Sequence, residues 1–262
     1  SEVEGISFRG RPQSPLIRKI TFIPPERKSL PNLGKYAQLE IDGERRLAGA
    51  VEASRGCKHF CLHCPIPPVY GGKFFVVPKE TVLKDIRDLV HSGVRHITFG
   101  DPDFLNAPGH SLAIVRFMHQ EFPDTTFDFT AKIEHILKHK RFFPELAGLG
   151  CLFVISAVES LSDKVLSRLR KGHTRQDVFA ALNIVREAGI ALRPSWVAFT
   201  PWTTLEDYWD MLETIEQEGL VDTVDPVQLS IRLLVPPGSS LLAGSDIMRY
   251  VEGFDQPNFY YR

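Results

Sequence analysis

The chain has 262 residues, of which 43% are hydrophobic and 24% are charged, and its formal net charge is −1. These proportions are typical of a globular protein with one large domain, in the size class of the α/β barrels. A charge so close to zero gives no electrostatic footprint for nucleic acid or an acidic membrane surface, so neither partner is expected. No apolar run is long enough to cross a bilayer, and the sequence does not start with a signal-peptide pattern.

The first 50 residues are rich in proline, arginine and lysine. They predict an irregular N-terminal extension that packs on the main domain. The only regular element expected there is a hairpin from Tyr36 to Leu47, which turns at Asp42-Gly43.

Short apolar runs alternate with amphipathic segments beyond residue 50, where the segment 50–56 predicts a strand that runs into a loop. The expected helices are 79–92, 110–122, 133–149 (interrupted near Pro144), 161–170, 175–188 and 205–218. The further expected strands are 96–99, 126–130, 151–157, 191–199 and 227–234. This alternation predicts parallel pairing with right-handed crossovers. The expected fold is therefore α/β, a partial (β/α)6 TIM-like barrel over 51–235, between the extension 1–50 and a C-terminal tail, 236–262.

Three of the four cysteines, Cys57, Cys61 and Cys64, lie within a span of eight residues, and the proline-rich segment 65–68 follows directly. A closed zinc site needs four ligands, and a closed iron–sulfur cluster needs four cysteines. Three cysteines on a cluster would leave one iron open to an outside ligand. A zinc site completed by His59 or His63 is the alternative, whereas a disulfide framework does not suit a chain so poor in cysteine. Reduced thiols and an oxygen-sensitive cluster predict a reducing cytoplasm.

Polar residues gather where the expected strands end, which is where barrels of this type carry their chemistry. They are the three cysteines, residues 100–103, Lys132 and Glu134, residues 156–160, residues 200–202 and residues 236–238. One cleft supplied from every strand is therefore expected.

The spacing Cys57-x3-Cys61-x2-Cys64 is similar to the signature with which the radical S-adenosylmethionine (SAM) superfamily binds a 4Fe–4S cluster. Val158-Glu-Ser160 and Lys171-Gly-His-Thr174 resemble the catalytic domains that follow cobalamin-binding domains in that superfamily. Residues 64–68, 97–105 and 197–202 resemble the members named for a CUAEP or CCAEP tail, although that tail is not in this sequence. The resemblance covers roughly residues 50 to 240.

The resemblance implies that the three cysteines hold three irons and that SAM chelates the fourth. One electron then cleaves a carbon–sulfur bond of SAM, and the resulting radical acts on a small-molecule or peptide substrate. Flavodoxin or ferredoxin is the implied electron donor. Cleavage to a 5′-deoxyadenosyl radical is the superfamily default. The more specific hypothesis is 3-amino-3-carboxypropyl transfer in organoarsenical biosynthesis of the arsinothricin type.

The resemblance also implies SAM contacts. Gly100 and Asp101 correspond to a Gly-Gly-Glu-like motif that holds the methionyl ammonium, and Asp103 could substitute for Asp101; the alternative is an ordinary Asp-Pro turn. Ser156 and Glu159 correspond to polar positions that contact the ribose or the methionine, with a helix cap as the alternative for the carboxylate.

Four further residues complete the implied SAM site. Lys132 could contact the SAM carboxylate or a substrate anion, or it could be an ordinary solvated lysine. His63 is expected to stack near the adenine. Phe199 and Thr200 stand where the family has its adenine contacts, but this sequence lacks the common Gly-x-Pro-Gly-Glu pattern there. The fourth cysteine, Cys151, begins a buried strand and is expected to be a core thiol.

Two other function classes compete with a radical SAM enzyme. A non-catalytic iron–sulfur or zinc module in electron transfer or assembly would not need the cleft. A methylthiotransferase or cobalamin-dependent methylase fragment would need an upstream domain, and 50 residues are too few for one.

Overall fold

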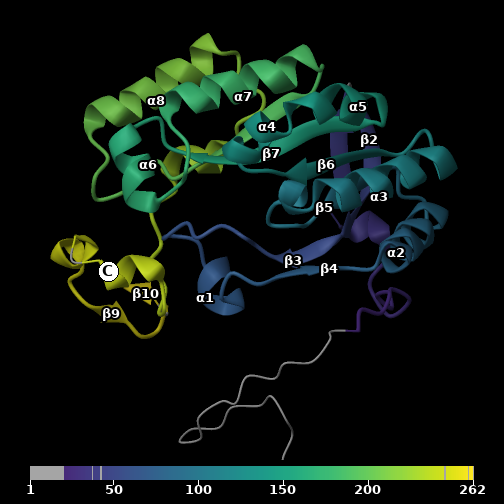
Figure 1. Ribbon diagram of the computed structural model, residues 1–262, viewed down its shortest axis with the longest axis horizontal. Coiled ribbons are helices and arrows are strands. Elements are labelled where there is room, and N and C mark those ends of the chain that lie inside the picture. The colour runs from purple at the N-terminus through teal and green to yellow at the C-terminus, as the bar shows by residue number, and fades with distance from the viewer. Residues whose placement is uncertain (1–20, 37, 42, 245, 259, 262) are drawn as a thin grey trace, which may run out of the picture.

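A curled six-stranded sheet forms the centre of the computed structural model, which describes residues 21–36, 38–41, 43–244, 246–258 and 260–261 (Figure 1). The strand order is β1-β2-β5-β6-β7-β8. The strands are β1 (Gln38–Ile41), β2 (Glu44–Val51), β5 (His96–Phe99), β6 (Thr126–Thr130), β7 (Cys151–Glu159) and β8 (Ala191–Trp196). All neighbours from β2 to β8 pair in parallel. The expected partial TIM-like barrel is confirmed.

The N-terminal hairpin is also confirmed, and it belongs to this sheet. β1 and β2 pair antiparallel from Gln38↔Leu47 to Ile41↔Glu44, and Gly43 supplies a positive φ of 75° at the turn. The residues of β2 from Ala48 onward then pair with β5. The sheet therefore starts within the segment expected to be an irregular extension.

The expected strand 227–234 does not form. In its place are the 3₁₀ helix η4 (Pro226–Ser230) and a single parallel bridge, Phe199↔Arg232. β8 ends at Trp196, whose backbone N–H donates to the side-chain oxygen of Gln228 at 3.0 Å. Beyond this contact, backbone pairing between these described segments is limited to Phe199, whose N–H donates to Ile231 and whose carbonyl accepts from Leu233.

Helices cover the outer face of the sheet (Figure 1). They are α2 (Lys79–His91), α3 (Pro108–Glu121), α4 (Ile133–Lys138), α5 (Phe143–Gly148), α6 (Asp163–Leu169), α7 (Arg175–Glu187) and α8 (Leu205–Gln217). The expected helix 133–149 is divided into α4, the 3₁₀ turn η3 (Lys140–Phe142) and α5, with Pro144 in the first turn of α5. Thr174 and Thr204 begin α7 and α8 with capping boxes. The main core lies between these helices and the sheet, whose strands supply side chains such as Phe99 and Phe127.

The cysteine segment lies in the connection between the two strands of a separate small sheet. β3 (Ser54–Gly56) pairs antiparallel with β4 (Phe74–Val76), and the short helix α1 (Ile66–Tyr70) lies between them. The expected strand 50–56 is thus two strands in two sheets. Gly56, directly before the cysteines, has a φ of 79°, and a Cβ there would lie 2.2 Å from the carbonyl oxygen of Lys73. Only glycine fits this turn.

A second, smaller core joins the C-terminal segment to the cysteine loop. Its buried members are Val165, Leu169, Trp202, Val235, Leu241 and Ile247, and Leu62 packs against them. The C-terminal segment supplies the 3₁₀ helices η5 (Ser240–Ala243) and η6 (Ile247–Tyr250) and the pair β9 (Phe254–Asp255) and β10 (Tyr260–Tyr261).

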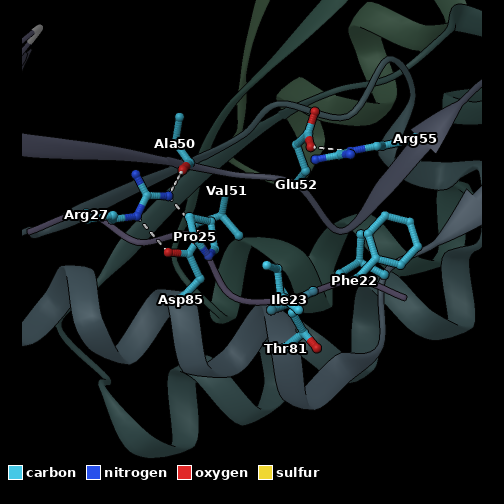
Figure 2. Close-up of a pocket in the computed structure, with 12 residues that line it drawn as sticks. Phe22, Ile23, Pro25, Arg27, Ala50, Val51, Glu52, Arg55, Thr81 and Asp85 are labelled. Atoms are coloured by element: carbon cyan, nitrogen blue, oxygen red, sulfur yellow. Dashed lines mark hydrogen bonds and ion pairs between the residues drawn. The ribbon is translucent and has the colours of Figure 1, made fainter. Parts of the chain in front are cut away.

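The lead-in before β1, which contains the 3₁₀ turn η1 (Leu33–Lys35), packs beside α2. Figure 2 shows Arg27 bound to Asp85 of α2 and to the carbonyl of Ala50. The surrounding pocket has a volume of about 250 Å³, and none of the three clustered cysteines lines it. Among the described residues, no helix is both long and apolar enough to span a membrane.

Candidate active site

The three clustered cysteines lie together as free thiols at the end of β3. Cys57 and Cys61 are buried and Cys64 is partly buried. The backbone N–H of Leu62 donates to the carbonyl of Leu169 at 3.0 Å, which fixes the loop to α6. Burial raises the pKa of the Cys64 thiol, and the neighbouring Cys61 and Cys57 raise it further. The thiol of Cys64 therefore lies close enough to those of Cys57 and Cys61 to interact with them electrostatically.

The fourth cysteine is separate from this group. Cys151 is buried in β7, and its Sγ lies 3.7 Å from the carbonyl oxygen of Phe153. Burial raises the pKa of this thiol well above its ordinary value. These contacts agree with the expected core thiol.

Asn106 contacts the cysteine group and was not predicted from the sequence. Its Nδ2 lies 3.7 Å from the Sγ of Cys57, and its backbone carbonyl accepts from Nζ of Lys58 at 2.9 Å. Hydrogen bonds to ligand sulfurs are among the features that tune iron–sulfur clusters. The only signal in the sequence was its place in the polar stretch after β5.

Glu159, at the end of β7, joins two basic side chains beside the cysteines. Its Oε1 lies 3.1 Å from Nε2 of His63 and 3.2 Å from Nζ of Lys171. Burial raises the pKa of this carboxyl, but the hydrogen bond from His63 and the charge of Lys171 outweigh it and lower the pKa to about 2. Glu159 also has a φ of 67°, which is uncommon for a residue other than glycine. The carboxylate is therefore held ionised at a strained strand end.

Lys132, after β6, contacts the cysteine loop from another side. Its Nζ lies 3.1 Å from Nδ1 of His59 and 3.1 Å from Oε2 of Glu134. Burial, together with the positive charge of Lys132, lowers the pKa of His59 to about 4. Gly172 lies directly against this group: a Cβ at this position would lie 3.0 Å from Oε2 of Glu134.

The two aspartates of the stretch after β5 have different surroundings. Asp101 accepts from the backbone N–H of Ala53 at 2.9 Å and from the Ser54 hydroxyl, so it anchors the start of β3. Burial raises the pKa of Asp101 to about 6. Asp103 is fully buried and faces His59 and a residue not singled out in the sequence, His135.

The remaining predicted residues lie at the same ends of the strands but make mainly structural contacts. Gly100 is exposed, and its N–H donates to the carbonyl of Val51 at 2.8 Å. The buried Ser156 hydroxyl donates to the carbonyl of Ala131 at 2.7 Å, which ties β7 to the loop after β6. Their suggested contacts with SAM stay predictions.

Phe199 and Thr200 lie toward α8. The Phe199 ring stacks on Tyr208 at 5.1 Å, and the Thr200 hydroxyl lies 2.8 Å from that of Thr203. Their suggested adenine contacts likewise stay predictions.

The inner face of the sheet carries a buried polar group that the sequence analysis missed. Nε2 of His96 lies 2.8 Å from Oδ1 of Asp128, which also accepts from the Thr98 hydroxyl at 2.6 Å. Phe153 stacks on His96 at 5.8 Å, and Arg193 lies over Phe153 at 5.0 Å. The sequence signal for this group is that its polar residues alternate with the apolar core residues along β5 and β6, which places them on the opposite face of the sheet.

Comparison with known proteins identifies the family. Residues 51–224 match the family described as the radical SAM superfamily, which is more than half of the chain and includes all three clustered cysteines. The chain belongs to the radical SAM superfamily. Members of this superfamily are enzymes, and their cofactors are a 4Fe–4S cluster and SAM.

The radical SAM chain is similar to several curated relatives. It is 30% identical over 199 residues to the tRNA-2-methylthio-N(6)-dimethylallyladenosine synthase of Desulfosudis oleivorans, which covers 72% of this chain and 42% of that protein. It is 25% identical over 205 residues to an uncharacterized methyltransferase of Pyrococcus horikoshii, covering 78% of this chain and 43% of that protein. The chain thus spans less than half the length of these relatives.

Solved structures show the same fold. A cobalamin-dependent SAM radical enzyme, OxsB, has a TM-score of 0.65 at 18% identity and covers 81% of this chain and 38% of its own. The radical SAM methyltransferase TsrM of Kitasatospora setae has a TM-score of 0.58 at 19% identity and covers 66% of this chain and 35% of its own. The expected likeness to cobalamin-type radical SAM catalytic domains is confirmed at the level of the fold.

The donor set fits the family's cluster. Three free thiols are grouped, and thiolates are the ligands of iron–sulfur clusters. The two histidines of the cysteine loop lie against other groups, His59 through Nδ1 against Lys132 and His63 through Nε2 against Glu159. Three thiols are therefore available in this loop as sulfur ligands.

Proposed function

We propose that this chain cleaves SAM reductively in the cleft at the carboxyl ends of its strands and uses the radical on a small-molecule or peptide substrate. The observation that carries the proposal is the group of three free cysteines within the matched region. In this proposal Cys57, Cys61 and Cys64 hold the cluster. When bound and reduced, the cluster supplies one electron that breaks a carbon–sulfur bond of SAM.

The residues around the cysteines would hold SAM and keep water out. Lys171 and Lys132 offer positive charge to a carboxylate, and Glu159 offers negative charge to an ammonium. Fixing a flexible cofactor at several charged points is what a site needs to direct one bond cleavage. We assign His63 of the cysteine loop to the adenine side of SAM. Its Nε2 lies 3.1 Å from Oε1 of Glu159, which is itself expected to contact SAM.

The finer assignment concerns the bond that breaks. We propose 5′-deoxyadenosyl radical formation as the default and 3-amino-3-carboxypropyl transfer, of the kind used in organoarsenical biosynthesis, as the specific reaction. The first releases 5′-deoxyadenosine from SAM and the second releases methylthioadenosine. Flavodoxin or ferredoxin in a reducing cytoplasm would provide the electron.

The deciding experiment is product analysis with reduced protein. Protein loaded anaerobically with iron and sulfide is reduced with dithionite, incubated with SAM, and analysed for 5′-deoxyadenosine and methylthioadenosine. Cys61→Ala should lose the cluster and both products, because two cysteines cannot hold the iron. Cys151→Ala is the matched control and should keep both. Protein that carries zinc without iron, or an intact cluster that cleaves no SAM, would refute the proposal.

A second candidate function is methylthio transfer to tRNA, which the 30% identity to the Desulfosudis oleivorans enzyme favours. The net charge of −1 gives this chain no basic footprint for RNA by itself. Incubation of the reduced protein with tRNA and SAM distinguishes the two candidates. A methylthiolated nucleoside in the digested tRNA would establish this second function, whereas its absence together with SAM cleavage supports the first.

A further inference from the structure

Two histidines and one aspartate converge beside the cysteine loop. Nδ1 of His135 lies 2.8 Å from Oδ2 of Asp103, and Nε2 of His59 lies 3.6 Å from the same oxygen. One ligand atom from each of the three residues lies within 4.8 Å of the other two. The residues come from three elements: the cysteine loop, the turn after β5, and α4.

These three atoms lack hydrogen-bond partners. His59 Nε2, Asp103 Oδ2 and His135 Nδ1 are all buried, and nothing in the described part of the chain hydrogen-bonds to any of them. Asp103 is 0% exposed, and its other oxygen accepts from the backbone N–H of Leu105 at 3.0 Å. Oδ2 of Asp103 faces the ring nitrogens of His135 and His59 at 2.8 and 3.6 Å, and a buried carboxylate that has lost its hydration needs positive charge beside it. Such a group calls for a cation.

From this geometry we infer that His59, Asp103 and His135 form a mononuclear site for a borderline divalent transition metal such as Zn²⁺. Two imidazole nitrogens and a carboxylate oxygen are a donor set that such metals accept. Ligand atoms that each lie about 2.1 Å from one ion are separated by roughly 3.0–3.4 Å at octahedral or tetrahedral angles. The distances of 2.8 and 3.6 Å lie on either side of that range.

The neighbouring charges suit a bound cation. If Nε2 of His59 binds the metal, the ring proton lies on Nδ1. Lys132 Nζ, which lies 3.1 Å from Nδ1, must then turn away from the ring, and Oε2 of Glu134 at 3.7 Å becomes the acceptor. A carboxylate behind a metal-bound histidine orients the ring and raises its basicity. Lys132 stays paired with Glu134 at 3.1 Å, so its charge is compensated. Asp103 then supplies the negative charge in direct contact with the ion.

Three protein ligands leave at least one position open on the metal. That position can take water or an oxygen or nitrogen donor of a substrate, beside the cysteine loop to which His59 belongs. The metal site is distinct from the three thiols and does not depend on SAM binding.

Elemental analysis of cluster-loaded protein tests the inference. Chelator-washed protein is dialysed against Zn²⁺, and zinc and iron are counted per chain. We expect one zinc in addition to the cluster iron. Asp103→Asn and His59→Gln should each weaken zinc binding at least about 10-fold, and Glu134→Gln by a factor within about 10–100, as for partners of metal ligands. His110→Gln, which alters a histidine outside the trio, should keep the zinc.

A triple variant, Cys57→Ala/Cys61→Ala/Cys64→Ala, tests whether the zinc is bound by the three cysteines in place of the cluster. It should still bind one Zn²⁺, and adding Asp103→Asn should abolish that binding. Co²⁺ in the triple variant should show d–d bands without thiolate charge transfer. If Asp103→Asn does not fold, the less buried His59→Gln carries the test. Zinc that disappears with the cysteines, or that is equal in His59→Gln and His110→Gln, would overturn the site. SAM cleavage in the same samples reports separately on the proposed function.

Discussion

Gly56 is the residue on which the position of the cysteine loop depends most directly. Gly56→Ala would place a methyl group 2.2 Å from the backbone carbonyl oxygen of Lys73 at a φ of 79°. Because a backbone atom cannot yield as a side chain does, β3 and β4 must separate. We expect the free energy of unfolding to fall by more than about 2 kcal/mol and the iron content to fall with it.

The control for this substitution is Gly71→Ala. Gly71 also has a positive φ, 57°, but no atom lies within 4 Å of its Cβ position. Its cost should be only the backbone preference, about 1 kcal/mol. Urea unfolding and iron analysis of both variants compare the two, and equal losses would show that the contact with Lys73 is unimportant.

His173 gives the site a pH dependence of stability. Its Nε2 lies 3.2 Å from the carbonyl oxygen of Val158, and burial followed by the charge of Lys171 lowers its pKa to about 4. Lys132 lowers the pKa further and Glu159 opposes these effects. Because the folded pKa lies below the ordinary 6.5, the unfolded chain binds more protons between these values. The stability from neutral His173 is therefore complete above pH 6.5 and is lost as the pH falls toward 4.

The test compares the free energy of unfolding at several pH values for the wild type and His173→Gln. The substitution should remove a pH-dependent part of up to about 3 kcal/mol between pH 6.5 and 4. The exposed His91→Gln is the control. An unchanged slope in His173→Gln would contradict the assignment.

At single positions the sequence was informative where spacing alone defines the chemistry. The three cysteines needed only their intervals. Asp101 and Asp103 could not be told apart, because both follow the same strand and only the fold turns Asp101 toward Ala53 and Asp103 toward His135. His135 was missed for the same reason, since its partners are distant in sequence.

At the scale of elements, the C-terminal segment supports the cysteine loop. Leu241 of η5 is 4% exposed in the core that includes Leu169 and receives Leu62. The Ser239 hydroxyl lies 3.5 Å from the carbonyl oxygen of Leu62. The segment after β8 thus contacts the loop between Cys61 and Cys64.

Leu241→Ala should therefore affect the cluster as well as stability. Truncating a buried leucine costs about 2–5 kcal/mol, and we expect the lower end because this core is small. Loss of the cluster's visible absorbance in the presence of a chelator should be faster than in the wild type. Leu205→Ala, at a leucine that is 77% exposed, should change neither quantity. Faster loss in both variants would argue against a specific support.

The helices and inner strands followed from periodicity, but the two ends of the sheet did not. The turn signal at Gly43 predicted the hairpin, yet its pairing with β5 depends on contacts more than 40 residues apart. The expected last strand was wrong: Gln228 of η4 binds the N–H of Trp196 through its side chain, and of the residues described there only Phe199 forms a backbone bridge, to Arg232. Local pattern carries no information about such a long-range competition.

At the scale of the whole molecule, the pair Arg27–Asp85 ties the described part of the lead-in to the barrel. Nε and Nη2 of Arg27 bind the two carboxylate oxygens of Asp85 at 2.7 and 2.8 Å, and Nη2 also donates to the carbonyl of Ala50 at 2.9 Å. The Asp85 side chain is 5% exposed and that of Arg27 is 29% exposed. The hydrogen bonds that Arg27 donates to the Asp85 carboxylate raise the pKa of Arg27. One residue therefore joins the lead-in, β2 and α2.

Arg27→Ala should leave a buried carboxylate without its partner and lower the free energy of unfolding by about 1–3 kcal/mol. Asp85→Ala and the double variant complete a mutant cycle, and we expect the second substitution to cost less once the first is present. A protease that cuts near Ile23 should also cleave Arg27→Ala faster than the wild type, because the lead-in is released from α2. Arg45→Ala, at an exposed pair with Glu40 on the hairpin, should change neither the stability nor the cleavage rate. Additive energies in the cycle would mean that the lead-in is held by its apolar contacts instead.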